Sequence, residues 1–169
     1  KQYGKLYNPD DFRELVHDEQ FGAYDGTKAH IVQEPVSEIT KYVVNRELKN
    51  TKRDDLVVIT SGGPGSGKTT AIKLADPQKF IGMKWGLDSV MGKIEKAKNM
   101  IDSVISKGGD AYFPYVLRDI ETAWMDGVVR RAISKGRTVP LKIFLEGSEA
   151  ANIAVKEVYK LYKNNKKVT

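Results

Sequence analysis

Cysteine does not occur in this sequence of 169 residues. Its absence excludes a disulfide framework and any metal site built from thiolates. No apolar run approaches the roughly 20 residues that a membrane-spanning helix needs, and no signal peptide is visible at the N-terminus. We therefore expect a protein that does not associate with membranes and works in the cytoplasm, where thiols and other reduced groups prevail.

Internal repeats and low-complexity segments are also missing. With 40% hydrophobic and 30% charged residues, the composition is that of an ordinary globular chain, long enough for one domain with a real core. The net charge of +6 favours anionic ligands, which include nucleotides and nucleic acid. No basic motif with interleaved aromatic residues supports nucleic acid as a partner. We expect the basic tail, Lys163–Lys167, to be a solvated helix end.

Predicted strands and helices alternate along the chain. Capping residues and hydrophobic spacing predict a short helix that starts at Asn8-Pro9-Asp10 and has Phe12, Leu15 and Val16 on one face. Further helices are predicted from Glu34-Pro35 to Leu48, and over Thr69–Ala75, Ser89–Lys107, Ile120–Ser134 and Ala150–Tyr162. Runs of β-branched and aromatic residues predict strands over Leu56–Thr60, Phe80–Trp85, Tyr112–Leu117 and Leu141–Leu145. Such alternation is typical of an α/β fold with a parallel sheet in three layers.

A glycine-rich segment directly follows the apolar run Leu56–Thr60. Its residues match the pattern G-x-x-x-x-G-K-[ST] in full: Gly62, Gly63, Pro64, Gly65, Ser66, Gly67, Lys68 and Thr69. Glycines let the backbone curl so that its N–H groups point at phosphate, and a following helix adds the positive end of its dipole. The motif predicts that Lys68 contacts the β- and γ-phosphates of ATP and that the Thr69 hydroxyl binds Mg²⁺. Thr70 is expected to contact the α-phosphate.

This motif, placed between a buried strand and a helix, indicates a P-loop nucleotide-binding domain. We expect a three-layer, P-loop NTPase-type parallel sheet flanked by helices. A single domain would span residues 1–169, with a helical N-terminal layer at 1–50 and the nucleotide-binding core at 56–145. The sequence lacks the N-K-x-D string that reads guanine, and it is short for a motor ATPase. A compact kinase fits best; the alternative is a nucleotide-binding module or ATPase that drives a partner protein.

Arginine residues cluster after the predicted strand Tyr112–Leu117. Arg118 ends that strand, and Arg131 and Arg137 lie around the end of the next predicted helix. Ligands of parallel α/β sheets bind at the carboxyl ends of the strands. Arg131 and Arg137 are therefore either ligand-binding or solvated residues, whereas Arg130 is expected to be solvated.

Two stretches of the sequence resemble the zeta-toxin family of P-loop kinases. They are Val57–Thr70 and RDIETAWMDGVVRRAISKGRTVP, which is similar to a pattern RDP…A(W/F)…G(V/A)…RA…GR-V-P of one branch. The segment KIEKAKNMIDSVISKGG between them is similar as well, so that the resemblance covers residues 56–140. It implies transfer of the γ-phosphate of ATP to a hydroxyl of a small molecule, such as UDP-N-acetylglucosamine or a related nucleotide sugar. It also implies an antitoxin protein as a partner, and it makes Arg131 and Arg137 catalytic candidates, with Arg118 as a lesser one.

The sequence leaves several candidates for the carboxylate that would accept the proton of the acceptor hydroxyl. The same branch carries an aspartate in a D-G-T-L string, whereas here Asp88 follows Trp85-Gly86-Leu87, three positions later. Asp88 is either the catalytic base or the N-cap of the helix predicted from Ser89. Asp119 either contacts the water shell of Mg²⁺ or caps the next helix. Glu146, after the predicted strand Leu141–Leu145, is a third candidate.

Overall fold

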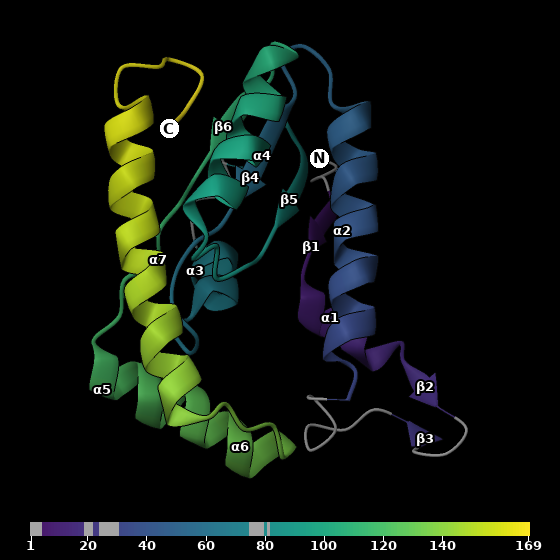
Figure 1. Cartoon of the computed structure of the whole chain (residues 1–169), viewed down its shortest axis with the longest axis vertical. Helices are drawn as coiled ribbons and strands as arrows, with labels where there is room; N and C mark the ends of the chain where they lie inside the picture. Colours follow the sequence, from purple (N-terminus) through teal and green to yellow (C-terminus); the bar gives the residue numbers. More distant parts are fainter. Residues whose placement is uncertain (1–4, 19–21, 24–30, 75–79, 81) are drawn as a thin grey trace.

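The protein is described here by a computed structural model that covers residues 5–18, 22–23, 31–74, 80 and 82–169. An all-parallel sheet of four strands, in the order β1-β5-β4-β6, is flanked by helices on both faces (Figure 1). The strands are β1 (Lys5–Tyr7), β4 (Leu56–Ile59), β5 (Met83–Leu87) and β6 (Asp110–Tyr112). The predicted α/β class with a parallel sheet is confirmed. A separate antiparallel pair joins β2 (His17–Asp18) and β3 (Gly22–Ala23).

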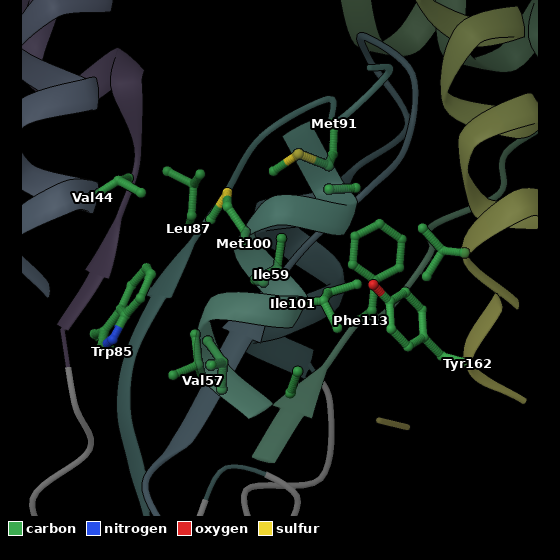
Figure 2. Packing of buried hydrophobic residues seen from close by; sticks show 14 residues of the cluster. Val44, Val57, Ile59, Trp85, Leu87, Met91, Met100, Ile101, Phe113 and Tyr162 are labelled. Atoms are coloured by element: carbon green, nitrogen blue, oxygen red, sulfur yellow. The ribbon is translucent and has the colours of Figure 1, made fainter. Parts of the chain in front are cut away.

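The central strand β4 has both faces covered, as its continuous apolar run predicts. Val57 and Ile59 belong to the larger core cluster, which also contains residues of α2 (Gln33–Asn50), α4 (Ile94–Ser106) and α7 (Leu141–Tyr162) (Figure 2). Val58 points to the opposite face and packs with Phe80, Met83 and Ile72 of α3 (Lys68–Leu74). Successive side chains of β4 thus point to opposite faces of the sheet, and each face is covered by different helices.

The N-terminal segment contributes a strand as well as helices. β1 lies beside β5 at one edge of the sheet, and α1 (Pro9–Glu14) follows it at once. The predicted helix start is confirmed, because the Asn8 side chain accepts a hydrogen bond of 2.9 Å from the Asp10 N–H and Pro9 occupies the first turn. The first residues of α1 consequently lie at the carboxyl end of the sheet.

Several predicted boundaries are wrong. The strand predicted over Leu141–Leu145 is the beginning of α7, in which Phe144, Ala151 and Val158 share the buried side. A short apolar run fits a strand and a buried helix equally well, and the helical spacing only becomes clear further along. The helix predicted from Ser89 begins at Ile94. The helix predicted over Thr69–Ala75 is expected to stop at Asp76-Pro77, because a residue before proline disfavours the helical conformation, and this pair lies outside the described residues.

The other two predicted strands are displaced. The strand predicted over Phe80–Trp85 is β5, which runs later, over Met83–Leu87. The strand predicted over Tyr112–Leu117 is β6, which ends at Tyr112; beyond it, Tyr115 alone forms a bridge, to Ser61. Phe113 lies between β6 and this bridge and packs in the core (Figure 2).

The C-terminal tail is more than a solvated helix end. α7 ends at Tyr162, and the chain turns back so that Val168 forms a parallel bridge with Ala111 of β6. The Lys167 ammonium pairs with the Asp110 carboxylate at 3.0 Å. The tail thus covers the outer edge of β6. Within the described part of the chain, no helix combines the length and apolarity required to traverse a bilayer.

Candidate functional site

The glycine-rich loop, residues 62–67, joins the carboxyl end of β4 to α3. Gly62 and Gly65 have φ angles of +148° and +72°, at which the backbone of a residue with a side chain would be strained. The Lys68 ammonium turns back over the loop and donates hydrogen bonds to the carbonyls of Gly62 and Gly63 at 2.8 and 2.9 Å. Burial lowers the pKa of Lys68, and the negative charge of nearby Asp88 partly offsets this. The Lys68 side chain is therefore partly desolvated.

Asp88 lies where β5 ends, next to the loop. Only 5% of the residue is exposed. Its carboxylate accepts a hydrogen bond of 2.6 Å from the Thr69 hydroxyl and one of 3.0 Å from the Thr60 hydroxyl. The alternative that Asp88 caps the following helix is wrong, because α4 has its N-cap at Lys93. Asp88 instead ties two adjacent strand ends to the first turn of α3.

The predicted helix over Ile120–Ser134 is present but is not uniform. It consists of α5 (Ile120–Thr122), the π-helix η3 (Ala123–Val129) and α6 (Arg130–Lys135). Gly136 ends it in the left-handed conformation, with φ of +65°, which is common for a glycine after the last helical residue. Gly127 of η3 lies so close to the loop that a Cβ atom there would be 2.5 Å from the carbonyl oxygen of Gly65. The π-helix is therefore seated directly on the glycine-rich loop.

Arg131 and Arg137 meet at one carboxylate. Arg137 donates a hydrogen bond to Asp10 of α1, and an Arg131 nitrogen lies 3.7 Å from the same Asp10 oxygen. Arg13, one turn further along α1, lies 3.4 Å from the other oxygen. Burial tends to raise the pKa of Asp10, but the hydrogen bond from Arg137 and the charges of the arginines outweigh it, so that this pKa lies below the usual value.

One cavity brings these groups together. It has a volume of about 550 Å³. Its charged and hydroxyl-bearing lining residues include Asp10, Arg13, Lys68, Thr69, Thr70, Asp88, Ser89, Arg131, Arg137 and Thr138. Five residues singled out from the sequence for catalysis or metal binding, namely Lys68, Thr69, Asp88, Arg131 and Arg137, therefore share one space.

Two charged residues of this cavity were missed by the sequence reasoning. Asp10 and Arg13 belong to a helix recognised only by its cap, and the three-residue strand β1 that leads into it carries no clear pattern. The usable signal would have been their position at the carboxyl end of a parallel strand, where ligands bind.

The remaining candidates lie elsewhere. Asp119 caps α5, accepting a hydrogen bond of 2.9 Å from the Thr122 N–H, and the bonds from Thr122 lower its pKa. Arg118 pairs with Asp126 at 3.1 Å and donates to the Gly65 carbonyl at 3.3 Å. Glu146, on an exposed side of α7, is 3.8 Å from the Lys142 ammonium rather than at a strand end.

A second cavity, of about 580 Å³, lies beside the same loop. Arg118, Asp119, Tyr115 and residues of α7 line it, together with Gly63, Pro64 and Ser66 of the loop. The Ser66 hydroxyl is buried and makes no hydrogen bond to any of the described residues. The glycine-rich loop thus has a cavity on two sides, and only the first contains Lys68, Thr69 and Asp88.

Comparison of the chain with models of known protein families and with curated proteins finds no match. The assignment of the site therefore rests on the sequence motif and on geometry. In the described part of the chain, no cluster of three or more His, Asp or Glu side chains is arranged to hold a metal ion. A cation at Thr69 and Asp88 would accordingly need further ligands from a bound molecule.

Proposed function

We propose that this protein is a P-loop kinase of the zeta-toxin type, which binds ATP with Mg²⁺ and phosphorylates a hydroxyl of a small molecule, such as a nucleotide sugar. One observation carries the proposal: Lys68, Thr69 and Asp88 line the same cavity as Arg131 and Arg137. A phosphoryl-transfer site needs a phosphate-binding loop, a carboxylate and cations for the charge on the transferred group. All three kinds of group meet here.

The loop supports phosphate binding by its shape and its charge. Its glycines at positive φ allow the backbone to turn tightly, as it does in loops that bind anions. The Lys68 ammonium now contacts two carbonyls of the loop, and phosphate oxygens would offer it stronger, charge-assisted partners. We expect the lysine to exchange those carbonyls for the β- and γ-phosphates.

Thr69 and Asp88 fit a magnesium ion. Their oxygens are 2.6 Å apart, at the edge of the cavity. Mg²⁺ in nucleotide sites takes one or two protein oxygens, with phosphates and water as its other ligands, which agrees with a donor set this small. When bound, the ion would neutralise charge on the phosphates.

The arginines and Asp88 supply the remaining chemistry. Arg131 and Arg137 can contact the phosphoryl group as it passes from the β-phosphate oxygen of ATP to the acceptor oxygen, when its equatorial oxygens carry most charge. The proton of the acceptor hydroxyl needs a base within hydrogen-bond reach. Of the two described carboxylates that line the cavity, Asp10 is paired with arginines, so that Asp88 is the candidate base. Asp88 serves either as this base or as a ligand of Mg²⁺, because a carboxylate bound to the ion is a poor proton acceptor.

The test is incubation with ATP, Mg²⁺ and a panel of nucleotide sugars, followed by ³¹P NMR and mass spectrometry. A phosphorylated sugar nucleotide that the wild type forms and Lys68→Ala does not would support the kinase. Release of inorganic phosphate with no phosphorylated acceptor would support an ATPase that drives a partner protein. No ATP binding by calorimetry would refute both.

A further inference from the structure

We infer that Asp10 is a positioning residue, which gathers Arg131 and Arg137 at the phosphate end of the cavity. The inference rests on the proposed phosphoryl-transfer function. It assigns a role in that site to Asp10, which belongs neither to the glycine-rich motif nor to the segment with the arginines. Asp10 and Arg137 are 127 positions apart in the sequence and are in direct contact. Their contact connects the N-terminal helix α1 to the segment that carries both arginines.

Several positive charges lie close together around Asp10. Lys68, Arg131 and Arg137 line one cavity, and Arg131 and Lys68 are close enough for Arg131 to lower the pKa of the lysine. Cations that share a confined space repel one another. Without Asp10, this repulsion would favour positions of the arginine side chains nearer to water. The Arg131 side chain is already 43% exposed, so that it can move in this direction. Asp10 offsets this repulsion.

Binding to Asp10 leaves both arginines able to hold phosphate. A guanidinium group has five N–H donors in a planar fork, and the contacts with Asp10 involve only one terminal nitrogen of each arginine. The other donors remain available to oxygens of a phosphoryl group. A carboxylate that holds one side of a guanidinium group therefore orients the N–H donors on its other side. Donors that are already oriented stabilise a transition state more effectively than mobile ones.

Asp10 itself is held in place from its own helix. The Asp10 N–H is bonded to the Asn8 cap, and Arg13 lies against its second oxygen. Arg13 in turn donates a hydrogen bond of 2.5 Å to Gln33 at the start of α2. The carboxylate thus has support from two helices that does not depend on its pairing with Arg137.

The experiment uses ADP, Mg²⁺ and aluminium fluoride, a mimic of the transferring phosphoryl group that needs no acceptor. Calorimetry gives the affinity for MgADP alone and the gain in affinity when aluminium fluoride is added. Asp10→Asn should leave the MgADP affinity within about 2-fold of the wild type and reduce the gain by about 10-fold or more. The matched control is Glu14→Gln, which removes one negative charge from the same helix, α1, at an exposed residue that does not line the cavity. It should keep the full gain.

A double-mutant cycle makes the test specific. Arg137→Ala should lose a similar gain, and the pair Asp10→Asn with Arg137→Ala should lose clearly less than the sum of the two single losses, because Asp10 acts in part through its contact with Arg137. Asp10→Glu keeps the charge and serves if Asp10→Asn does not fold; it should restore most of the gain. A full gain in Asp10→Asn, a stronger gain, or additive losses would overturn the inference while leaving the kinase intact. A wild type that shows no gain with aluminium fluoride would refute the proposed function itself, and the inference with it.

Discussion

The role of Asp88 can be separated from its contribution to stability. Its buried carboxylate accepts hydrogen bonds from Thr69 and Thr60. Hydrogen bonds to a charged group contribute about 1.5–3 kcal/mol each, but burying the charge costs part of that sum. Asp88→Ala leaves the wholly buried Thr60 hydroxyl without this acceptor, and we expect a loss of about 2 kcal/mol in the free energy of unfolding. Asp88→Asn keeps the shape and a carbonyl acceptor, so that its loss should stay below about 1 kcal/mol.

Turnover should fall in both variants, because both lack the carboxylate. Asp88→Asn removes the negative charge that a metal ion or a hydroxyl proton would need, and we expect the rate of phosphoryl transfer to fall by about 10²-fold or more. Urea denaturation measures the stability of each variant, and product formation measures the rate. Asp102→Asn is the control: Asp102 accepts hydrogen bonds from Tyr162 and Lys98 far from the cavity, and its loss should affect stability only. Wild-type turnover in Asp88→Asn would refute the catalytic assignment, and wild-type stability in Asp88→Ala would refute the structural one.

Three further predictions concern the loop and its neighbours. Lys68→Ala should abolish ATP binding in calorimetry while its circular dichroism stays native. Burial lowers the pKa of Lys68, so that this side chain loses its charge at a lower alkaline pH than an ordinary lysine does. The ATP affinity of the wild type should begin to fall at that lower pH. Arg131→Ala and Arg137→Ala should lower kcat far more than ATP affinity, whereas exposed Arg130→Ala should change neither; equal losses in both quantities would indicate plain ground-state binding. Gly127→Ala should destabilise the protein by about 1–3 kcal/mol in urea, although alanine favours helices, because its Cβ would clash with Gly65; a stabilised variant would show that η3 does not rest on the loop.

Local patterns and long-range contacts account for what the sequence could and could not predict. The strand β4, the loop and Lys68 follow one another along the chain, so that a motif of adjacent residues was enough to predict them. The partner of Asp88 depends on the register between β4 and β5, which brings Thr60 beside it from a neighbouring strand. The contact of Asp10 with Arg137 joins residues that no local pattern connects.

The errors in helices and strands have a similar cause. Residues 141–145 alone are compatible with a strand, and only their continuation through Tyr162 on one buried side makes them helical. The π-helical turn at Ala123–Val129 carries no propensity signal either. It coincides with the close approach of Gly127 to the loop, a tertiary contact that no local pattern reveals.

This π-helix also decides which side chains of α6 reach the cavity. In η3 the Arg130 N–H bonds to the Met125 carbonyl, five residues back instead of four. A helix advances by about 100° with each residue, so that one residue absorbed in a wide turn rotates everything after it by about that angle. Were the segment to tighten into an ordinary helix, α6 would turn on its axis and Arg131 would swing away from Asp10 and Lys68. The π-helix therefore determines the rotation of α6 about its axis and, with it, the direction of the Arg131 side chain. Because Gly127 of η3 contacts Gly65, this rotation depends on the shape of the glycine-rich loop.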